Sequence, residues 1–321
     1  MEKLVYQMFI SGCEDKDCLE KALAKGLGGV IFFTKDIDSA EQFRALISDI
    51  KSKSLISPFL SIDQEGGRVE RTEKIHERYL SQRFAFQKGK EFLIEQSEKI
   101  AEELKSYGIN LNFSPCIDVN TNPNNPIIGE RAFSDNPLEV IEGGKIVADA
   151  LRKKGVIPCI KHFPGHGDAD KDSHLTLPEI RLSLEEMKKT HILPFKSLID
   201  DGIEMVMAAH LHCKCFDKDV IPASLSKNAI GYLRNNLNYD GVVITDDMVM
   251  KGVQNFGTLE AMKMAISAGV DMFIFRDIDE NLVETIDFLV QYVEKDETLK
   301  QKVLKANERI KSLKLRYLDI H

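Results

Sequence analysis

Several classes of protein are excluded by what this sequence lacks. It contains no run of about 18 apolar residues, so we expect no membrane-spanning helix. Positive charge is not in excess, because the formal net charge is −8, which argues against general binding to nucleic acids or to anionic lipid. No Gly/Ser-rich or Pro-rich linker interrupts the 321 residues, so we expect residues 1–321 to form a single domain.

Cysteine pairs with the spacing of a zinc or redox motif are also lacking. The six cysteines include Cys213 and Cys215, which are separated by one residue rather than by the two of a C-x-x-C motif. Cys116 and Cys159 lie in apolar segments, where a reduced thiol behaves as a small hydrophobic side chain. The apolar part of residues 1–12 is short, is interrupted by a glutamine, and has no small-residue cleavage site behind it. We therefore expect free thiols, a first strand rather than a signal peptide, and a cytoplasmic location.

What the sequence does contain is a series of short apolar segments, separated by stretches long enough for a helix. Most of these segments are continuous rather than alternating, which is typical of parallel strands that are covered on both faces. Eight such segments in a chain of this length predict an α/β protein with the TIM (β/α)8 barrel fold. The segments are residues 4–11, 29–33, 59–63, 109–114, 156–161, 205–210, 242–246 and 271–275.

Helix signals lie between these segments. Asn136 and Pro137 supply a cap and a first-turn proline for a helix over residues 138–154. Ser183 and Glu186 have the spacing of a capping box for the next helix. We expect Pro194 to break that helix into two pieces, because proline lacks the backbone N–H that a helix interior needs.

In a TIM barrel the active site lies at the carboxyl ends of the strands, so chemically useful side chains are expected just after each apolar segment. The sequence follows this rule. Two glycines after the third segment permit a tight turn that lets Asp63 and Arg71 point at a ligand. Each residue alone has an ordinary structural use, but their joint placement predicts a site. The residues are Asp63, Arg71, Asp118, Arg131, Lys161, His162, His210, His212, Asp246, Asp247, Arg276 and Asp277.

The densest group of titratable residues follows the fifth segment, where residues 161–174 read KHFPGHGDADKDSH. Within it, Asp172 stands two residues before His174. In a bent loop a carboxylate at this spacing can hold one ring nitrogen of the imidazole, which fixes its tautomer and raises the basicity of the other nitrogen. This pair is the candidate for proton transfer.

This stretch resembles the KHFPGHGxxxxDSH signature of the glycoside hydrolase family 3 β-N-acetylhexosaminidases, the NagZ type. The resemblance extends over most of the chain and includes DQEGGRVER (63–71), NFSPCIDV (112–119), IGERAFSDNP (128–137), MAAHLH (207–212) and ITDDMVMKGV (244–253). It implies a single-domain barrel that removes terminal β-linked N-acetylglucosamine with retention of configuration, without a cofactor or metal. The implied substrate is a small carbohydrate, a muropeptide with GlcNAc joined to 1,6-anhydro-N-acetylmuramic acid or another GlcNAc β-glycoside, and the implied state is a monomer or weak dimer.

The resemblance also implies a role for individual residues. Asp246 matches the family's nucleophile, although the residues themselves leave Asp246 and Asp247 nearly equal. His174 matches the acid/base, and Asp172 matches the partner of that histidine. Residues 72–86 depart from the proline-containing pattern expected there, so the conformation of rim segment 72–92 is left open. The residues matching those that bind the non-reducing sugar are Asp63, Arg71, Arg131, Lys161 and His162.

Three other functions remain possible at this stage. A metal-dependent hydrolase on the same barrel would draw ligands from His162, His166, His174, His210 and His212, but the first segment offers no His-x-His. A sugar-binding protein without catalysis would not need both His174 and Asp246. A phosphorylase would use phosphate in place of water, and a histidine acid/base does not repel that anion as a carboxylate would. The sequence does not decide between water and phosphate.

Overall fold

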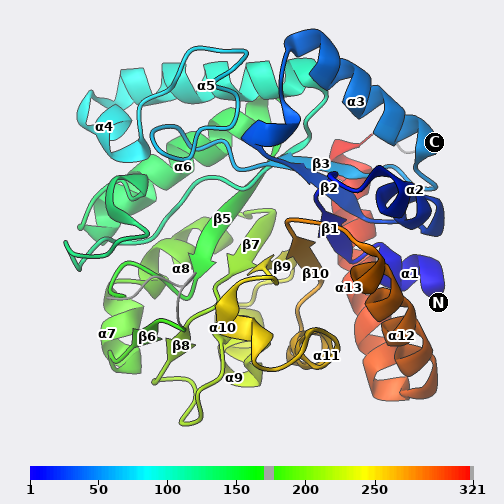
Figure 1. Cartoon of the computed structure of the whole chain (residues 1–321). Helices are drawn as coiled ribbons and strands as arrows, with labels where there is room; N and C mark the ends of the chain where they lie inside the picture. The colour runs from blue at the N-terminus through cyan, green and yellow to red at the C-terminus, as the bar shows by residue number, and fades with distance from the viewer. Residues whose placement is uncertain (170–176, 319–321) are drawn as a thin grey trace.

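The computed structural model describes residues 1–169 and 177–318, and its centre is a closed barrel of parallel strands (Figure 1). Around the barrel the strand order is β1-β10-β9-β7-β5-β4-β3-β2. All eight predicted segments supply a barrel strand, so the predicted TIM barrel is confirmed. The strands are β1 (Phe9–Ser11), β2 (Gly29–Phe32), β3 (Phe59–Ile62), β4 (Leu111–Asn112), β5 (Ile157–Phe163), β7 (Met205–Ala208), β9 (Val242–Asp247) and β10 (Met272–Phe275).

Helices surround the barrel and connect successive strands (Figure 1). Two short strands, β6 (Glu179–Ile180) and β8 (His212–Cys213), pair with each other outside the barrel. The helices are α1 (Glu2–Tyr6), α2 (Lys16–Lys25), α3 (Ala40–Lys53), α4 (Gln82–Gln87), α5 (Lys90–Tyr107), α6 (Pro137–Lys153), α7 (Leu184–Lys189), α8 (Ile192–Asp200), α9 (Lys227–Gly231), α10 (Lys251–Gln254), α11 (Thr258–Ala268), α12 (Glu280–Lys295) and α13 (Glu297–Tyr317).

The predicted capping residues begin their helices as expected. The side chain of Asn136 accepts a hydrogen bond from the Leu138 amide at the start of α6. Ser183 and Glu186 form the reciprocal pair of bonds of a capping box at the start of α7. These local signals were readable because each depends on residues three or fewer positions apart.

Two predictions about local structure were wrong in detail. Residues 4–6 are not part of the first strand but lie in α1, where Tyr6 donates a hydrogen bond of 2.8 Å to Asp287 of α12. A short apolar run cannot distinguish a buried helix from a buried strand by periodicity alone. The break between α7 and α8 falls at residues 190–191, ahead of Pro194, which occupies the first turn of α8, where a missing N–H leaves no bond unmade.

The amino ends of the strands are covered by α13. Asn307 donates a hydrogen bond to the Leu4 carbonyl ahead of β1, and Tyr317 donates one to Glu204, which directly precedes β7. Arg309 binds Asp271, the residue before β10. In Figure 1, α13 lies beside α12 and α1, on the side where the N-terminus is found. The opposite end, where the strands terminate, is not covered by this helix.

Within the described residues, no helix combines the length and apolar character needed to cross a membrane.

Candidate active site

A cavity of about 410 Å³ opens at the carboxyl ends of the strands. The structure brings the predicted residues of β3, β5 and β9 together there. Asp172 and His174 lie outside the described residues, so their predicted roles rest on the sequence motif. The predicted site residues that line the cavity are Asp63, Arg71, Arg131, Lys161, His162, Asp246, Asp247 and Arg276.

The turn after β3 is shaped by its two glycines, as the sequence predicted. Gly66 and Gly67 both adopt positive φ, at 91° and 62°. A Cβ atom on Gly66 would lie 2.3 Å from the Leu80 carbonyl oxygen, so no other residue fits. This turn leads the chain back toward the cavity, where Arg71 follows.

The rim segment that the sequence left open is tied to this turn. The carboxylate of Glu70 is buried and accepts hydrogen bonds from the Thr72 hydroxyl and the Tyr79 amide. The chain then enters α4, where Gln82 bonds to both backbone groups of Cys116, beyond β4. The rim segment thus braces the third and fourth strand ends without the proline pattern expected from the resemblance.

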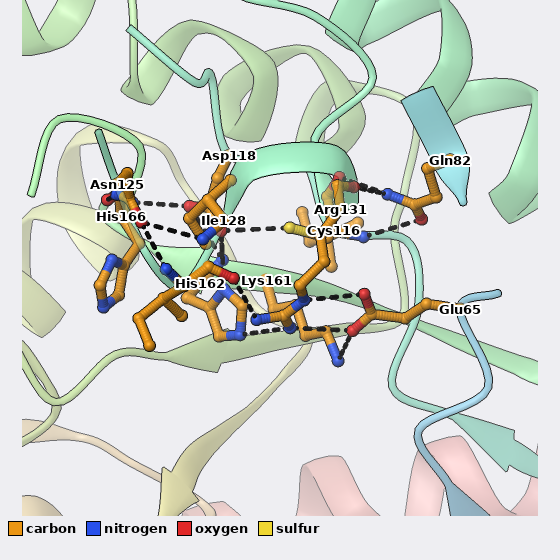
Figure 2. A network of polar contacts seen from close by, with 12 residues as sticks. Glu65, Gln82, Cys116, Asp118, Asn125, Ile128, Arg131, Lys161, His162 and His166 are labelled. Atoms are coloured by element: carbon orange, nitrogen blue, oxygen red, sulfur yellow. Dashed lines mark hydrogen bonds and ion pairs between the residues drawn. The ribbon is translucent and has the colours of Figure 1, made fainter. Parts of the chain in front are cut away.

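Glu65 links two of the predicted sugar-binding residues, as Figure 2 shows. Its carboxylate accepts two bonds of 2.9 Å from Arg131, and the Lys161 ammonium lies 2.5 Å away. Lys161 also pairs with Asp63 at 2.7 Å. Burial alone would raise the pKa of Glu65, but the charges of Arg131 and Lys161 outweigh burial and hold that pKa below its ordinary value. The network therefore fixes two cations and Asp63 at the cavity wall.

His162 is held in one tautomer by Asp118. Its Nδ1 lies 2.6 Å from an Asp118 oxygen, and its Nε2 lies 3.3 Å from the Arg131 guanidinium. Because arginine can only donate, Nε2 accepts and Nδ1 carries the proton that goes to Asp118. Asp118 is fully buried, yet its pKa is lowered, because the ring N–H of His162 and the backbone N–H of His166 donate to it and outweigh the effect of burial.

The two adjacent carboxyl groups at the end of β9 have different environments. Asp247 pairs with Arg276 and accepts a bond of 3.2 Å from the Val249 amide, and burial raises its pKa. Asp246 accepts a bond of 2.8 Å from the Asp247 amide. Burial opposes ionisation of Asp246 too, but the electrostatic influence of His162 and His210, together with the Asp247 amide and the Lys161 ammonium, outweighs it, so its pKa is lowered. Asp246 is thus the one kept as an anion without an ion pair to a neighbouring arginine.

His210 forms hydrogen bonds with the backbone at the end of β9. Its Nδ1 lies 2.7 Å from the Ser224 hydroxyl, and its Nε2 lies 3.1 Å from the carbonyl oxygens of both Asp246 and Asp247. Since carbonyls only accept, Nε2 carries the proton. Both ring nitrogens are occupied, so His210 positions the backbone of the two aspartates rather than facing a ligand.

Two polar side chains at the cavity have unused donors or acceptors within the described part of the chain. The Nε of Arg71 and both ring nitrogens of His166 are buried without a hydrogen-bond partner there. Arg71 instead packs its guanidinium 5.7 Å above the ring of Phe33. Burial lowers the pKa of His166 to about 4, so its ring is neutral at pH 7. Among the described residues nothing occupies these groups, so they are candidates for binding a polar ligand.

The predicted alternative of a metal site finds little support in the donor set. Among the described residues, Cys116, Asp118 and His162 place ligand atoms within 4.8 Å of one another. However, burial raises the pKa of the Cys116 thiol well above its ordinary value, and the Arg131 guanidinium already occupies the outer nitrogen of His162. His212 lies away from this group, 3.4 Å from the Ile221 carbonyl. The residues present fit a hydrogen-bonded network better than they fit a cation.

Two residues of this site were not among the predicted binding residues. Glu65 lies inside the quoted motif 63–71, and Asp118 was noted only as following the fourth strand. The available signal was that a buried lysine and a buried arginine need a carboxylate between them. That signal becomes visible only when Lys161 and Arg131 are known to be neighbours.

Comparisons with known proteins agree with this geometry. A beta-hexosaminidase from Methylococcus capsulatus is 33% identical over 270 residues, covering 82% of this chain and 79% of the relative. Beta-hexosaminidase A from Pseudoalteromonas piscicida is 34% identical over 269 residues, covering 77% of this chain but only 45% of the relative. The structure of a glycoside hydrolase family 3 beta-N-acetylglucosaminidase from Paenibacillus superposes with a TM-score of 0.93 at 31% identity, covering 99% of this chain and 62% of that one.

The chain therefore spans about half the length of some of these relatives and most of the length of others. Whether residues 1–321 are one domain on their own stays a prediction. The model of the Glycosyl hydrolase family 3 N terminal domain matches residues 1–313. This match confirms the predicted family resemblance and enzyme class, and the chain belongs to glycosyl hydrolase family 3.

Proposed function

We propose that the chain is a retaining exo-β-N-acetylglucosaminidase. The observation that carries this proposal is the state of Asp246, which is held as an anion at a cavity wall lined with fixed hydrogen-bond donors. A retaining glycosidase needs a carboxylate nucleophile on one side of the bond and an acid/base on the other. The names of the relatives, beta-hexosaminidase and beta-N-acetylglucosaminidase, support the choice of sugar.

In the proposed first step, the Asp246 carboxylate attacks the anomeric carbon while the bond to the leaving oxygen breaks. His174 gives its proton to that oxygen. In the second step His174 takes a proton from water, the water oxygen attacks the anomeric carbon, and the Asp246 carboxylate is released. Two inversions at the same carbon give net retention. Asp172 would orient His174 and stabilise its charged form.

The proposed sugar-binding groups are positioned before any ligand arrives. Lys161 and Asp63 hold each other at the end of β5 and β3, and Glu65 fixes Arg131. Such preorganised charge-assisted donors bind hydroxyl and acetamido oxygens without paying for reorganisation during the reaction. Arg71 and His162 complete the set. The chain contains no tryptophan, so stacking on the sugar ring falls to Phe, Tyr or His.

The natural substrate that fits this proposal is a muropeptide carrying terminal GlcNAc, consumed during peptidoglycan recycling in the cytoplasm by a monomer or weak dimer. The motif resemblance supports this choice. Phosphate as the acceptor in place of water is the alternative that the same residues allow.

One experiment tests the proposal at three levels. Turnover of an aryl β-N-acetylglucosaminide should greatly exceed turnover of the matching β-glucoside. A slow fluorinated substrate should label Asp246, and sugar release should be the same with and without inorganic phosphate. A label on Asp247 would reassign the nucleophile, a phosphate requirement would make the enzyme a phosphorylase, and turnover abolished by chelation would point to a metal. Binding without turnover would indicate a sugar-binding protein.

A further inference from the structure

A second and larger cavity, of about 1130 Å³, lies at the opposite end of the barrel from Asp246. It is lined by Gln7, Pro58 and Asn110, which precede β1, β3 and β4, and by one side of α13. The amino end of a TIM barrel is normally a stabilising face rather than a binding face. A cavity of this size there calls for an explanation.

Positive charge gathers around this cavity. Among the described residues, its lining contains six lysines and a single acid, Glu308, although the formal net charge of the whole chain is −8. Lys105 donates a hydrogen bond of 3.1 Å to the Gly155 carbonyl. In the part of the chain that the structure describes, the other five form no ion pair; they are Lys3, Lys51, Lys305, Lys311 and Lys314.

Lys314 differs from the other lysines because it is buried. Its side chain is 3% exposed, and its Nζ has no hydrogen-bond partner among the described residues. Its contact is with the ring of Phe59, whose centroid lies 5.0 Å from Nζ. Burial lowers the pKa of Lys314 to about 7, and the charge of Lys3 adds to this effect. An ammonium without a partner in such a place costs stability.

The neighbouring polar groups do not supply the missing partner. Asn110 accepts from the Leu60 amide and donates to the Pro58 carbonyl. Asn307 accepts from Gln7 and donates to the Leu4 and Val303 carbonyls. Their hydrogen-bonding groups are used within the fold, so the Nζ of Lys314, at the cavity wall, is left without a partner among the described residues.

Part of the remaining wall of the cavity is apolar. Leu4, Leu55, Ile56, Leu304 and Leu315 line it, and Leu55 and Leu315 are more than half exposed, at 55% and 61%. Exposed leucines beside rim lysines form a surface that is partly apolar and partly positively charged. A ligand that satisfies both must carry an anionic group and an apolar body.

We propose that this cavity binds a small amphipathic anion, with a carboxylate or phosphate group on Lys314 and an apolar body along the leucines. The rim lysines attract the anion, and the buried ammonium gains the partner that the fold does not provide. Charge-assisted hydrogen bonds to a buried cation are stronger than those between neutral groups. The site is separate from the proposed sugar site and does not depend on it.

Calorimetric titration of the full chain tests the proposal with four probes. Octyl phosphate and octanoate, which distinguish a phosphate from a carboxylate headgroup, should bind with one saturable site. Octan-1-ol, which has the same apolar body without charge, and inorganic phosphate, which has the charge without the body, should bind at least tenfold more weakly. Equal binding of the alcohol, or no saturable binding of either amphiphile, would overturn the proposal.

Two variants locate the site. Lys314→Met should weaken octyl phosphate binding about ten- to a hundredfold, whereas Lys302→Met, an exposed change on the same helix and outside the cavity, should not. If Lys314→Met does not fold, Leu315→Asp places a negative charge at the exposed rim and should repel both anions while sparing the alcohol. Its control is Phe288→Asp, which is equally exposed on α12. Unchanged anion affinity in the folded variants would show that binding occurs elsewhere.

Discussion

Lys161 and Lys314 are both buried, at opposite ends of the same barrel, and their surroundings act on them in opposite directions. Lys161 is 1% exposed and Lys314 is 3% exposed. Burial lowers the pKa of both, but Asp63 and Glu65 more than reverse this for Lys161, whose pKa is raised. Lys314 has no carboxylate partner among the described residues, and its pKa falls to about 7. Burial alone therefore does not tell what a lysine is for.

The comparison extends from the two side chains to the two ends of the barrel. At the carboxyl end, Lys161 belongs to a network in which each charge has a counter-charge, so the side chains are rigid before a ligand binds. At the amino end, the charge of Lys314 is left uncompensated, which weakens the fold until something pairs with it. A buried charge that is paired indicates that its side chain is held in position for binding. A buried charge that is unpaired indicates a place where a ligand can supply the counter-charge.

The largest expected effect separates the chemistry of the two ends. Asp246→Ala should lower kcat on an aryl β-N-acetylglucosaminide on the order of 10⁴-fold or more, because the covalent step has no nucleophile. Lys314→Met, at the other end, should leave kcat within about twofold. Steady-state kinetics of both variants make the measurement. Comparable losses in the two would mean that the ends are coupled and that the comparison fails.

The next effect concerns the proton donor proposed for the carboxyl end. His174→Ala should lose about 10²–10⁴-fold on a disaccharide, whose leaving group needs a proton, and much less on a nitrophenyl glycoside in the glycosylation step. Asp172→Ala should show the same pattern, since the imidazole of His174 loses the carboxylate that orients it. Azide, which needs no base, should partly restore the second step. Equal losses on good and poor leaving groups, without rescue, would assign the proton donor to another residue.

A smaller effect tests what pairing does for a buried lysine. Lys161→Met should reduce kcat/KM about ten- to a hundredfold, because a sugar-binding cation and the anchor of Asp63 are both lost. It should also lower the free energy of unfolding by about 1–3 kcal/mol, since Glu65 keeps Arg131 but loses one counter-charge. Urea titration measures this. Lys153→Met, which removes an exposed ion pair with Glu98, is the control and should change stability by less than about 1 kcal/mol.

The last effect has the opposite sign. The unfolded-state pKa of Lys314 is the ordinary 10.5 and the folded value is about 7, so its cost to the fold is complete below pH 7 and disappears as the pH rises toward 10.5. Lys314→Met should therefore raise the free energy of unfolding at pH 6–7, on the order of a few kcal/mol. The gain should shrink between pH 7 and 10. A gain that does not vary with pH would mean that the charge of Lys314 is not what costs stability.

How far the sequence predicts this structure depends on the range of the interactions. The barrel was predictable because each strand is a continuous apolar segment followed by its own polar residues, as at Asp63 and Asp246. Helix starts at Asn136 and Ser183 were predictable because their bonds are local. Residues 4–6 were misassigned because their burial depends on α12, almost at the other end of the sequence.

The parts of the site that the sequence did not predict are those that depend on contacts between distant segments. Asp246 and Asp247 are equivalent in the sequence, and only the ion pair of Asp247 with Arg276 of the following strand end distinguishes them. Glu65 gains its role from Arg131, 66 positions later. From the sequence, Lys314 is expected to be an exposed lysine on a charged helix. Only the packing of α13 against the barrel shows that it is buried.

The position of α13 also constrains the order in which the molecule can be completed. Asn307 bonds to Leu4, 303 residues earlier, and other residues of the same helix contact the starts of β3, β7 and β10. During synthesis the strands leave the ribosome before this helix does. Their amino ends therefore stay uncovered until α13 has been synthesised. Contacts that span nearly the whole chain slow folding and prolong the exposure of partly assembled barrel. Nascent chains that end before α13 are thus the intermediates in which chaperone dependence and aggregation should concentrate.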